Sequence, residues 1–374
     1  MVSNVPTNPT VVEICCGIGG TRKAFSDTCF DVVQSIDNEE TVCNFHKMFW
    51  GDVDQIDINE CKLSDVKSAN VLSAGFPCQP FSTSGYRTGF SHSQGNVYSS
   101  LIRLIDHHTY EATLLENVQG LLSNENNKTF KIVIFELSQR YKFVEWITFN
   151  LLSLGIPMNR PRVVIVAHNY RREIFACLRE QFFMPSTPNL FPEFRKLTYE
   201  GVQKDDSPNE LAGRVIDGDY YVENYMPKNI NFVGDLMHFI FSEKLGDFDI
   251  FSGRFWGRTG KTTFYTSENQ FSHSIGTSMG GAPTFGFDPL FATDDVIEEV
   301  KKVSNYQINH SGFFVFRLTP KYALNFFGER AKVFCEALGK LEAPLAAKYK
   351  LIGNLFAPDQ AIVPIKELHQ AIVN

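Results

Sequence analysis

The stretch VVEICCGIGG, residues 11–20, decides the fold. Its first six residues have the apolar character of a buried strand, and a glycine-rich turn follows at once. A helical pattern covers residues 21–30, and DVVQSID, residues 31–37, again resembles a strand. Strands that alternate with helices pair in parallel through right-handed crossovers. We therefore expect an α/β fold with a doubly wound, mostly parallel sheet whose ligand crevice lies at the carboxyl ends of the strands.

The same alternation continues as far as residue 169. Further strands are predicted at residues 69–75, 112–117, 142–150 and 162–169, with a helix at residues 99–108. Beyond residue 170, prolines and many Asp and Asn residues interrupt the pattern up to about residue 312. We expect a second, smaller region there that is irregular or β-rich.

The composition is that of a folded, intracellular protein. Hydrophobic residues make up 43% of the 374 residues and charged residues 21%, which excludes a disordered chain. No apolar run reaches the roughly 18 residues that a membrane span needs, and the first ten residues do not resemble a secretory signal. The eight cysteines are too sparse for a disulfide framework, so we expect free thiols in a reducing compartment.

The net charge of −7 argues against a general polyanion binder, because such affinity comes from Lys and Arg that neutralise phosphates. One stretch of the middle region is nevertheless locally basic. It contains Arg254, Arg258 and Lys261, together with Trp256 and other aromatic residues. This combination suits contacts to phosphates and base edges, although a β-rich surface with scattered charge would have the same composition.

The glycine-rich turn is the first candidate site. Gly17, Gly19 and Gly20 allow a ligand to approach the backbone at the start of a helix. Asp37 ends the next strand, 20 residues after Gly17, where a carboxylate can accept both hydroxyls of a ribose. The pair favours an adenosine-containing cofactor. Asp52 is a candidate for the adenine edge, or else an ordinary loop acid.

Three further sites follow predicted strands. Cys78 lies between two prolines in GFPCQPFS, and this stiff turn would hold a thiol as a nucleophile requires. Glu116 ends an apolar strand, so burial should raise its pKa toward neutrality. Arg160 and Arg162 alternate on one strand and can point together toward the crevice, although salt bridging would also explain either residue.

In this order the motifs resemble the cytosine-5 DNA methyltransferase family, which uses S-adenosylmethionine. The matching segments are EICCGIGG, SIDNE, GDV, GFPCQPFS, QGNVYSSLIRLI, ENVQGLL, GIPMNRPR, FRLTPKYALNFFG and YKLIGNLFAPDQA. The resemblance implies that Cys78 attacks C6 of a flipped-out cytosine while Glu116 binds its N3 and amine. Arg162 would hold O2 of the base, and Arg160 would support the loop.

The resemblance also implies a class I methyltransferase fold, a cofactor pocket and no metal site. The residues implied to bind the cofactor are Glu13, Cys15, Gly17, Ile18, Gly19, Gly20, Asp37, Asn38, Asp52, Val53, Gly75, Pro77 and Asn354. Because Asn354 would return to the pocket, the catalytic domain is expected to be discontinuous, with residues 1–175 and 340–374. Cys15 stands where an aromatic residue is usual, which predicts weaker stacking on adenine.

Residues 176–339 would then form the target-recognition region and hinge. The residues expected to contact nucleic acid are Gln79, Ser82, Arg254, Arg258, Lys261, Thr277 and Gly280. Double-stranded DNA with a short recognition site is the first choice of substrate, and the protein is expected to be a monomer. A tRNA-methylating branch is the close alternative, because SLGIP before the arginines resembles it. A nicotinamide dehydrogenase or an inactive binding homologue are more remote alternatives.

Overall fold

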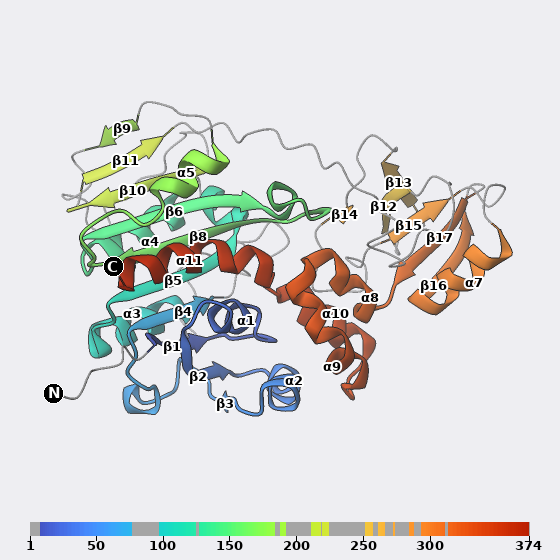
Figure 1. Ribbon diagram of the computed structural model, residues 1–374, viewed down its shortest axis with the longest axis horizontal. Helices are drawn as coiled ribbons and strands as arrows, with labels where there is room; N and C mark the ends of the chain where they lie inside the picture. The colour runs from blue at the N-terminus through green and yellow to red at the C-terminus, as the bar shows by residue number, and fades with distance from the viewer. Residues whose placement is uncertain are drawn as a thin grey trace.

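The computed structural model (Figure 1) describes residues 8–76, 97–124, 127–183, 188–191, 211–217, 219–223, 251–256, 261–265, 272–273, 284–287, 293–310 and 313–373. A large sheet with helices on both faces lies at one end of the molecule, and a smaller sheet lies at the other. A group of helices near the C-terminus connects them (Figure 1).

The large sheet has ten strands in the order β3-β2-β1-β4-β5-β8-β6-β10-β11-β9. The strands are β1 (Thr10–Ile14), β2 (Asp31–Asp37), β3 (Asp54–Gln55), β4 (Val71–Gly75), β5 (Ala112–Val118), β6 (Phe143–Asn150), β8 (Pro161–His168), β9 (Pro188–Phe191), β10 (Ala212–Ile216) and β11 (Asp219–Glu223). Pairing is parallel from β3 through β5 and antiparallel from β5 to β9. The carboxyl ends of β1, β2, β3, β4 and β5 therefore lie along one edge.

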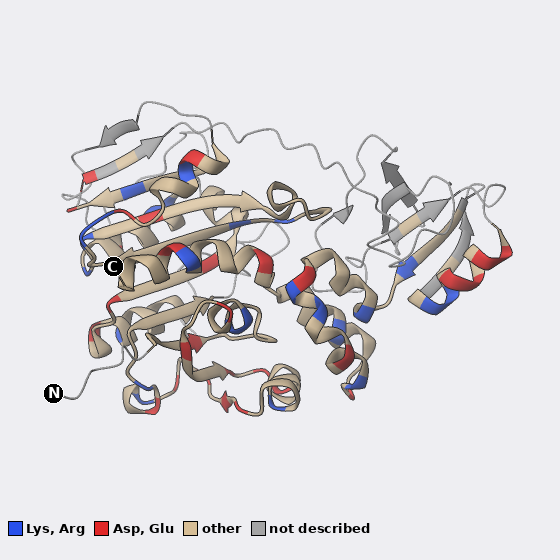
Figure 2. Ribbon diagram, in the orientation of Figure 1, with Lys and Arg blue, Asp and Glu red and all other residues tan. Residues whose placement is uncertain are grey.

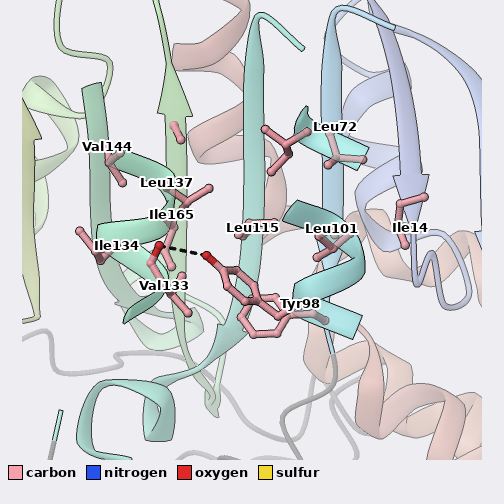
Figure 3. Close-up of a cluster of buried hydrophobic side chains, with 14 of the residues drawn as sticks. Ile14, Leu72, Tyr98, Leu101, Leu115, Val133, Ile134, Leu137, Val144 and Ile165 are labelled. Atoms are coloured by element: carbon pink, nitrogen blue, oxygen red, sulfur yellow. Dashed lines mark hydrogen bonds between the residues drawn. The ribbon is translucent and has the colours of Figure 1, made fainter. Parts of the chain in front are cut away.

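Helices cover both faces of this sheet (Figure 1). They are α1 (Gly20–Ser26), α2 (Glu40–Trp50), α3 (Val97–His108), α4 (Lys128–Ser138), α5 (Ala176–Phe182) and α11 (Pro358–Val373), with the 3-10 helices η1 (Leu63–Asp65), η3 (Gln119–Ser123) and η4 (Leu151–Leu154). On one face, Leu101 and Leu137 pack against Leu72 and Leu115 (Figure 3). Tyr98 is buried in this core because its hydroxyl donates to the carbonyl of Val133, at 3.0 Å.

The opposite face of the large sheet has its own core. Phe25 of α1 and Ile365 of α11 pack there with Val11 and Leu114 of the sheet. The first and last described helices thus share one apolar layer, so this face of the sheet is covered only when both are present. The strands are largely uncharged, and most Lys, Arg, Asp and Glu residues lie on helices and loops (Figure 2).

The smaller sheet has five antiparallel strands in the order β13-β12-β15-β17-β16. The strands are β12 (Phe251–Trp256), β13 (Lys261–Tyr265), β15 (Thr284–Phe287), β16 (Ser304–His310) and β17 (Phe313–Leu318). One helix, α7 (Asp294–Val303), packs on it through Val296 and Val300. A separate two-stranded sheet joins β14 (Ser272–His273) to β7 (Met158–Asn159) in parallel.

Short helices join the two sheets. They are α8 (Pro320–Ala323), η9 (Leu324–Phe327), η10 (Glu329–Phe334), α9 (Cys335–Lys340) and α10 (Leu345–Asn354). A third core continues from Phe285 and Phe316 of the small sheet, through Phe326, to Phe45 of α2. The small sheet is therefore packed on the helices of this junction as well as connected to them by the chain.

The predicted class I α/β fold with a second β-rich region is confirmed. The sheets do not divide the chain at residue 176, however, because β9, β10 and β11 extend the large sheet. These strands pair antiparallel, β10 with β11 and β11 with β9. Antiparallel pairing needs no crossover helix, and this explains why the sequence shows no alternation there. The division into residues 1–175 with 340–374, and 176–339, stays a prediction. Across the described segments, every helix is too short or too polar to cross a bilayer.

Candidate active site

The glycine-rich turn joins β1 to α1, and its glycines differ in what surrounds them. Gly17 has φ +55, and a Cβ there would meet nothing within 4 Å. Gly19 has φ +87, and its Cβ would lie 2.2 Å from Trp50 Nε1. A Cβ on Gly20 would lie 2.0 Å from the carbonyl oxygen of Phe356. Gly17 thus leaves open space for a ligand, whereas Gly19 and Gly20 are needed for packing. Ile18, between them, is buried in the core.

Asp37 lies at the carboxyl end of β2, beside this turn. Its Oδ2 accepts the Gly17 N–H at 3.1 Å, and its Oδ1 accepts the Glu39 N–H at 3.0 Å. Burial raises the pKa of this carboxyl, and the backbone hydrogen bonds from Glu39 and Gly17 oppose the rise. Each oxygen of the carboxylate still has an acceptor position for a ligand hydroxyl.

Asp52 and Val53 come directly before β3, whose first residue, Asp54, pairs with Ile36 of β2. The Asp52 carboxylate is 61% exposed and pairs with Arg22 at 2.7 Å. Arg22 also lies over the Trp50 ring, 4.9 Å from its centroid. Asp52 thus pairs with α1 from the segment after α2, and its assignment to the adenine edge stays a prediction.

Asp57 follows β3 and was not singled out in the sequence. The Ile56 N–H donates to the carbonyl of Asp37 at 3.1 Å, which places Asp57 at the same strand edge as Asp37. The Asn38 amide donates to Asp57 Oδ2 at 3.4 Å. Burial, together with the charges of Asp37 and Asp57, raises the pKa of Cys15 to about 12. Asp57 could have been found by asking which acid follows the third parallel strand.

Glu13 points into the sheet face under α1 rather than toward the strand edge. It is 1% exposed, and its Oε2 accepts the Ser35 hydroxyl at 3.0 Å. Burial raises its pKa to about 7, against hydrogen bonds from Thr21 and Ser35 and the charge of Arg22. The protonated form of this carboxyl is therefore populated near neutral pH, as expected for a buried acid.

Glu116 and Arg162 form an ion pair at the carboxyl end of β5. In the antiparallel β5–β8 register Glu116 lies opposite Val164, so Arg162 is its diagonal neighbour on the same face. The Arg162 Nε donates to Glu116 Oε1 at 2.8 Å, and the side chains are only 9% and 12% exposed. Burial raises the pKa of Glu116, and the charges of Arg162 and Arg160 oppose the rise. The predicted direction of this shift is confirmed.

Gly75 connects the acid to the glycine-rich turn. A Cβ on Gly75 would lie 3.4 Å from Glu116 Oε2 and 3.9 Å from the carbonyl oxygen of Cys15. The end of β4 thus lies between Glu116 and the β1 turn, and the two candidate sites are neighbours.

In the sequence, the predicted nucleophile comes three residues after the end of β4. Cys78, Pro77, Gln79 and Ser82 are outside the described residues. Phe76 is the last described residue before them, and its carbonyl accepts the Asn117 amide at 3.2 Å. Asn117 is 2% exposed and adjoins Glu116. Asn117 therefore fixes the backbone of Phe76, two residues before Cys78, beside Glu116. This role was not predicted from the sequence.

Arg160 and Arg162 have different partners. Arg160 is fully buried, and its Nη2 donates to the carbonyls of Gly353 and Leu355 at 2.7 and 2.8 Å. These residues flank Asn354, the exposed last residue of α10. The two guanidiniums were expected to point together toward the crevice. Arg162 binds the acid, as expected, but the guanidinium of Arg160 binds the C-terminal segment instead.

Of the residues predicted to contact nucleic acid, two lie on described strands. Arg254 is in β12 opposite Thr263, and Lys261 is in β13 opposite Trp256. Arg258, Thr277 and Gly280 lie outside the described residues. In the part of the chain that the structure covers, no cluster of His, Cys, Asp or Glu could hold a metal ion.

The family model for C-5 cytosine-specific DNA methylases matches residues 9–239, more than half of the chain. The chain belongs to this family. Within this methylase family, it is 34% identical over 157 residues to the Type II methyltransferase M.BsuFI of Bacillus subtilis. It is 32% identical over 160 residues to M.SsoII of Shigella sonnei. These matches cover 42% of this chain in both cases, and 38% and 42% of the relatives' own lengths.

Two solved structures share the fold over nearly the whole length. The S. pombe Dnmt2 methyltransferase superposes with a TM-score of 0.56 and 14% identity, covering 98% of this chain and 99% of that one. A putative DNA modification methyltransferase from an E. coli prophage gives a TM-score of 0.54 at 14% identity, with 98% and 100% coverage. At this identity the likeness concerns the fold alone.

Proposed function

We propose that this protein transfers a methyl group from S-adenosylmethionine to C5 of a flipped-out cytosine in DNA. The observation that carries the proposal is the buried Glu116–Arg162 pair, which lies next to the Gly17 turn across Gly75. A carboxyl with a raised pKa that can bind a ring nitrogen and a turn that can bind a cofactor are thus adjacent at one strand edge. Membership of the cytosine-specific methylase family supports the same chemistry.

The residues at the turn fit the cofactor. Gly17 has free space at its Cα, and Asp37 has acceptor positions for the two ribose hydroxyls. Asp57 at the end of β3 is a further candidate to bind the exocyclic amine of adenine, beside the sequence-predicted Asp52. The acidic surroundings also suit a ligand that carries a sulfonium and an ammonium group. When bound, S-adenosylmethionine supplies an electrophilic methyl group.

The chain's own residues activate the base. Cys78 would add its sulfur to C6, and Glu116 would donate a hydrogen bond or its proton to N3, which stabilises the charge that addition creates. Arg162 keeps the acid oriented through its bond to Glu116 and would also bind O2 of the base. C5 can then accept the methyl group. Loss of the C5 proton and expulsion of the Cys78 thiolate restore the aromatic ring, so that sulfur is both nucleophile and leaving group.

DNA is the proposed substrate, and the protein is proposed to act as a monomer inside the cell on a short duplex site. The basic segment around Arg254 and Lys261 supports a nucleic-acid partner, and the Type II methyltransferase relatives favour DNA. Methylation of a tRNA is the second candidate, because SLGIP before the arginines resembles the tRNA-methylating branch.

Trapping on 5-fluorocytosine tests this function. Fluorine at C5 cannot leave as a proton does, so an attacking thiol stays bound to the base. We expect a covalent complex with a fluorinated DNA duplex in the presence of S-adenosylmethionine, and none with Cys78→Ser. Labelled methyl transfer to unmodified duplex and to a tRNA transcript should be measured side by side. Transfer to the transcript alone would replace DNA by tRNA, and turnover by Cys78→Ser would refute the mechanism.

A further inference from the structure

Arg160 has more contacts than a loop support requires. Its backbone N–H donates to Asn150 Oδ1 at 2.8 Å, at the end of β6. Its carbonyl accepts the amide of Gln360, a fully buried residue of α11, at 3.2 Å. Its guanidinium binds the carbonyls of Gly353 and Leu355 and lies over the Phe327 ring, 5.0 Å from the centroid. One residue therefore joins β6, β8, α10 and α11.

The segment that Arg160 holds runs along the cofactor side of the site. Leu355 and Phe356 contact Gly20 in the glycine-rich turn. One helical turn before Asn354, Lys350 pairs with Glu39 at 2.7 Å, and the Glu39 N–H in turn binds Asp37. Asn354 is exposed, while the residues on both sides of it are buried. Its position thus depends on the two carbonyls that Arg160 binds.

The same arginine lies near the base-binding acid. Its charge stabilises the ionised form of Glu116, second to that of Arg162. Its strand neighbour Asn159 is paired through β7 with β14, whose residues belong to the predicted recognition region. Arg160 is thus in contact with the cofactor side and within electrostatic reach of the base side.

We propose that Arg160 is a positioning residue that fixes the position of Asn354 relative to Glu116. Occupation of the cofactor site and alignment of the base-binding acid are thereby coupled. The proposal rests on the proposed function. A guanidinium suits this task because it can donate to two carbonyls from a fixed plane, whereas an ammonium cannot reproduce that geometry. The coupling acts through the backbone carbonyls of Gly353 and Leu355 and requires no contact between Arg160 and either ligand.

A double-mutant cycle between Arg160 and Asn354 tests this coupling. The dissociation constant of S-adenosylmethionine should be measured by calorimetry for wild type, Arg160→Lys, Asn354→Ala and the double variant. We expect each single change to weaken binding about 10-fold, which is typical for loss of a hydrogen bond to a charged group. The double variant should be weakened about 10- to 20-fold, because Arg160 acts through Asn354, rather than the roughly 100-fold of independent effects.

A matched control and a milder variant keep the test decisive. Arg330→Lys also alters an arginine that anchors the C-terminal segment, through Asp359 at 2.6 Å, but away from Asn354. It should leave cofactor affinity unchanged. If Arg160→Lys fails to fold, as judged by circular dichroism, Asn150→Ala is the milder variant. It removes the bond to the Arg160 backbone together with the local bonds of Asn150 to Asn159 and Leu152, leaves the guanidinium in place, and should weaken binding by about 3-fold.

The pH dependence of trapping on 5-fluorocytosine separates positioning from charge. Arg160→Lys retains the charge near Glu116 and should keep the wild-type pH profile, while Arg160→Gln should move its alkaline limb to higher pH. Additive effects in the cycle, or wild-type cofactor affinity in Arg160→Lys and Asn150→Ala, would refute the coupling even if wild type traps the base. A wild type that neither binds the cofactor nor traps the base would overturn the proposed function, and this inference with it.

Discussion

The large sheet collects Asp37, Asp57, Gly75 and Glu116 at the carboxyl ends of neighbouring strands, whereas the antiparallel small sheet has no edge at which all strands end. Parallel strands joined by crossover helices all point the same way, so residues far apart in sequence meet at one edge. In an antiparallel sheet, the strand ends alternate between two edges. Strand direction therefore predicts which residues of the large sheet can form a site. It makes no such prediction for the small sheet.

The largest expected effect concerns Glu116, near the carboxyl end of β5, compared with Glu111 at the other end. Glu116→Gln keeps the size of the side chain but cannot supply a proton, so we expect methyl transfer to fall about 1,000-fold. Glu111→Gln changes an exposed acid just before the other end of β5 and should keep wild-type activity. Rates should be measured with labelled cofactor at saturation. Equal losses in the two variants would remove the distinction between strand ends.

The next test compares two glycines of the turn. Gly20→Ala would place a Cβ 2.0 Å from a backbone oxygen, and we expect a loss of about 3 kcal/mol of unfolding free energy in urea. Gly17→Ala meets open space but keeps a strained positive φ, and should cost about 1 kcal/mol while weakening cofactor binding. The reverse order of stabilities would contradict the division between packing and ligand-binding glycines.

Glu13 tests whether the buried polar groups of the large sheet cost stability. Its pKa is raised to about 7 in the folded state, so the unfolded chain ionises first as pH increases. The contribution of Glu13 to the unfolding free energy should therefore be largest below about pH 4.5. It should fall by about 3 kcal/mol as the pH rises through 7 and then level off. Glu13→Gln should remove this part of the pH dependence. Unfolding curves of equal slope against pH in both proteins would show that Glu13 is not the cause.

The smallest expected effect concerns the small sheet. Arg254→Ala and Arg258→Ala should each weaken nucleic-acid binding several-fold and lower the salt slope by about 1, as loss of one phosphate contact does. Cofactor affinity is the control and should not change. If both affinity and salt slope are unaltered in the two variants, this segment lies outside the interface.

The sequence predicts the large sheet well because each element there has its own pattern. Residues 31–37 were predicted as a strand and form β2 with the same bounds. The glycines after β1 and the carboxylates toward the carboxyl ends of β2 and β5 were located by the same reasoning. Asp57 was missed because β3 has only two residues, too few to show a strand pattern.

Other features could not be predicted because they depend on contacts between distant segments. Nothing near Arg160 in the sequence indicates that its guanidinium binds Gly353 and Leu355, nearly two hundred residues away. The strands β9, β10 and β11 join the large sheet by antiparallel pairing, which leaves no helical crossover in the sequence. Asn117 could have been identified only by knowing that β4 and β5 are neighbours.

The contact between Gly20 and Phe356 also has a consequence for biosynthesis. A ribosome adds ~5–20 residues per second, so the glycine-rich turn is synthesised on the order of tens of seconds before the segment that packs on it. During that time the apolar layer formed by Phe25 and Val11 lacks its covering helix, α11. Nascent chains of this protein should therefore be clients of molecular chaperones until residues 358–373 have left the exit tunnel.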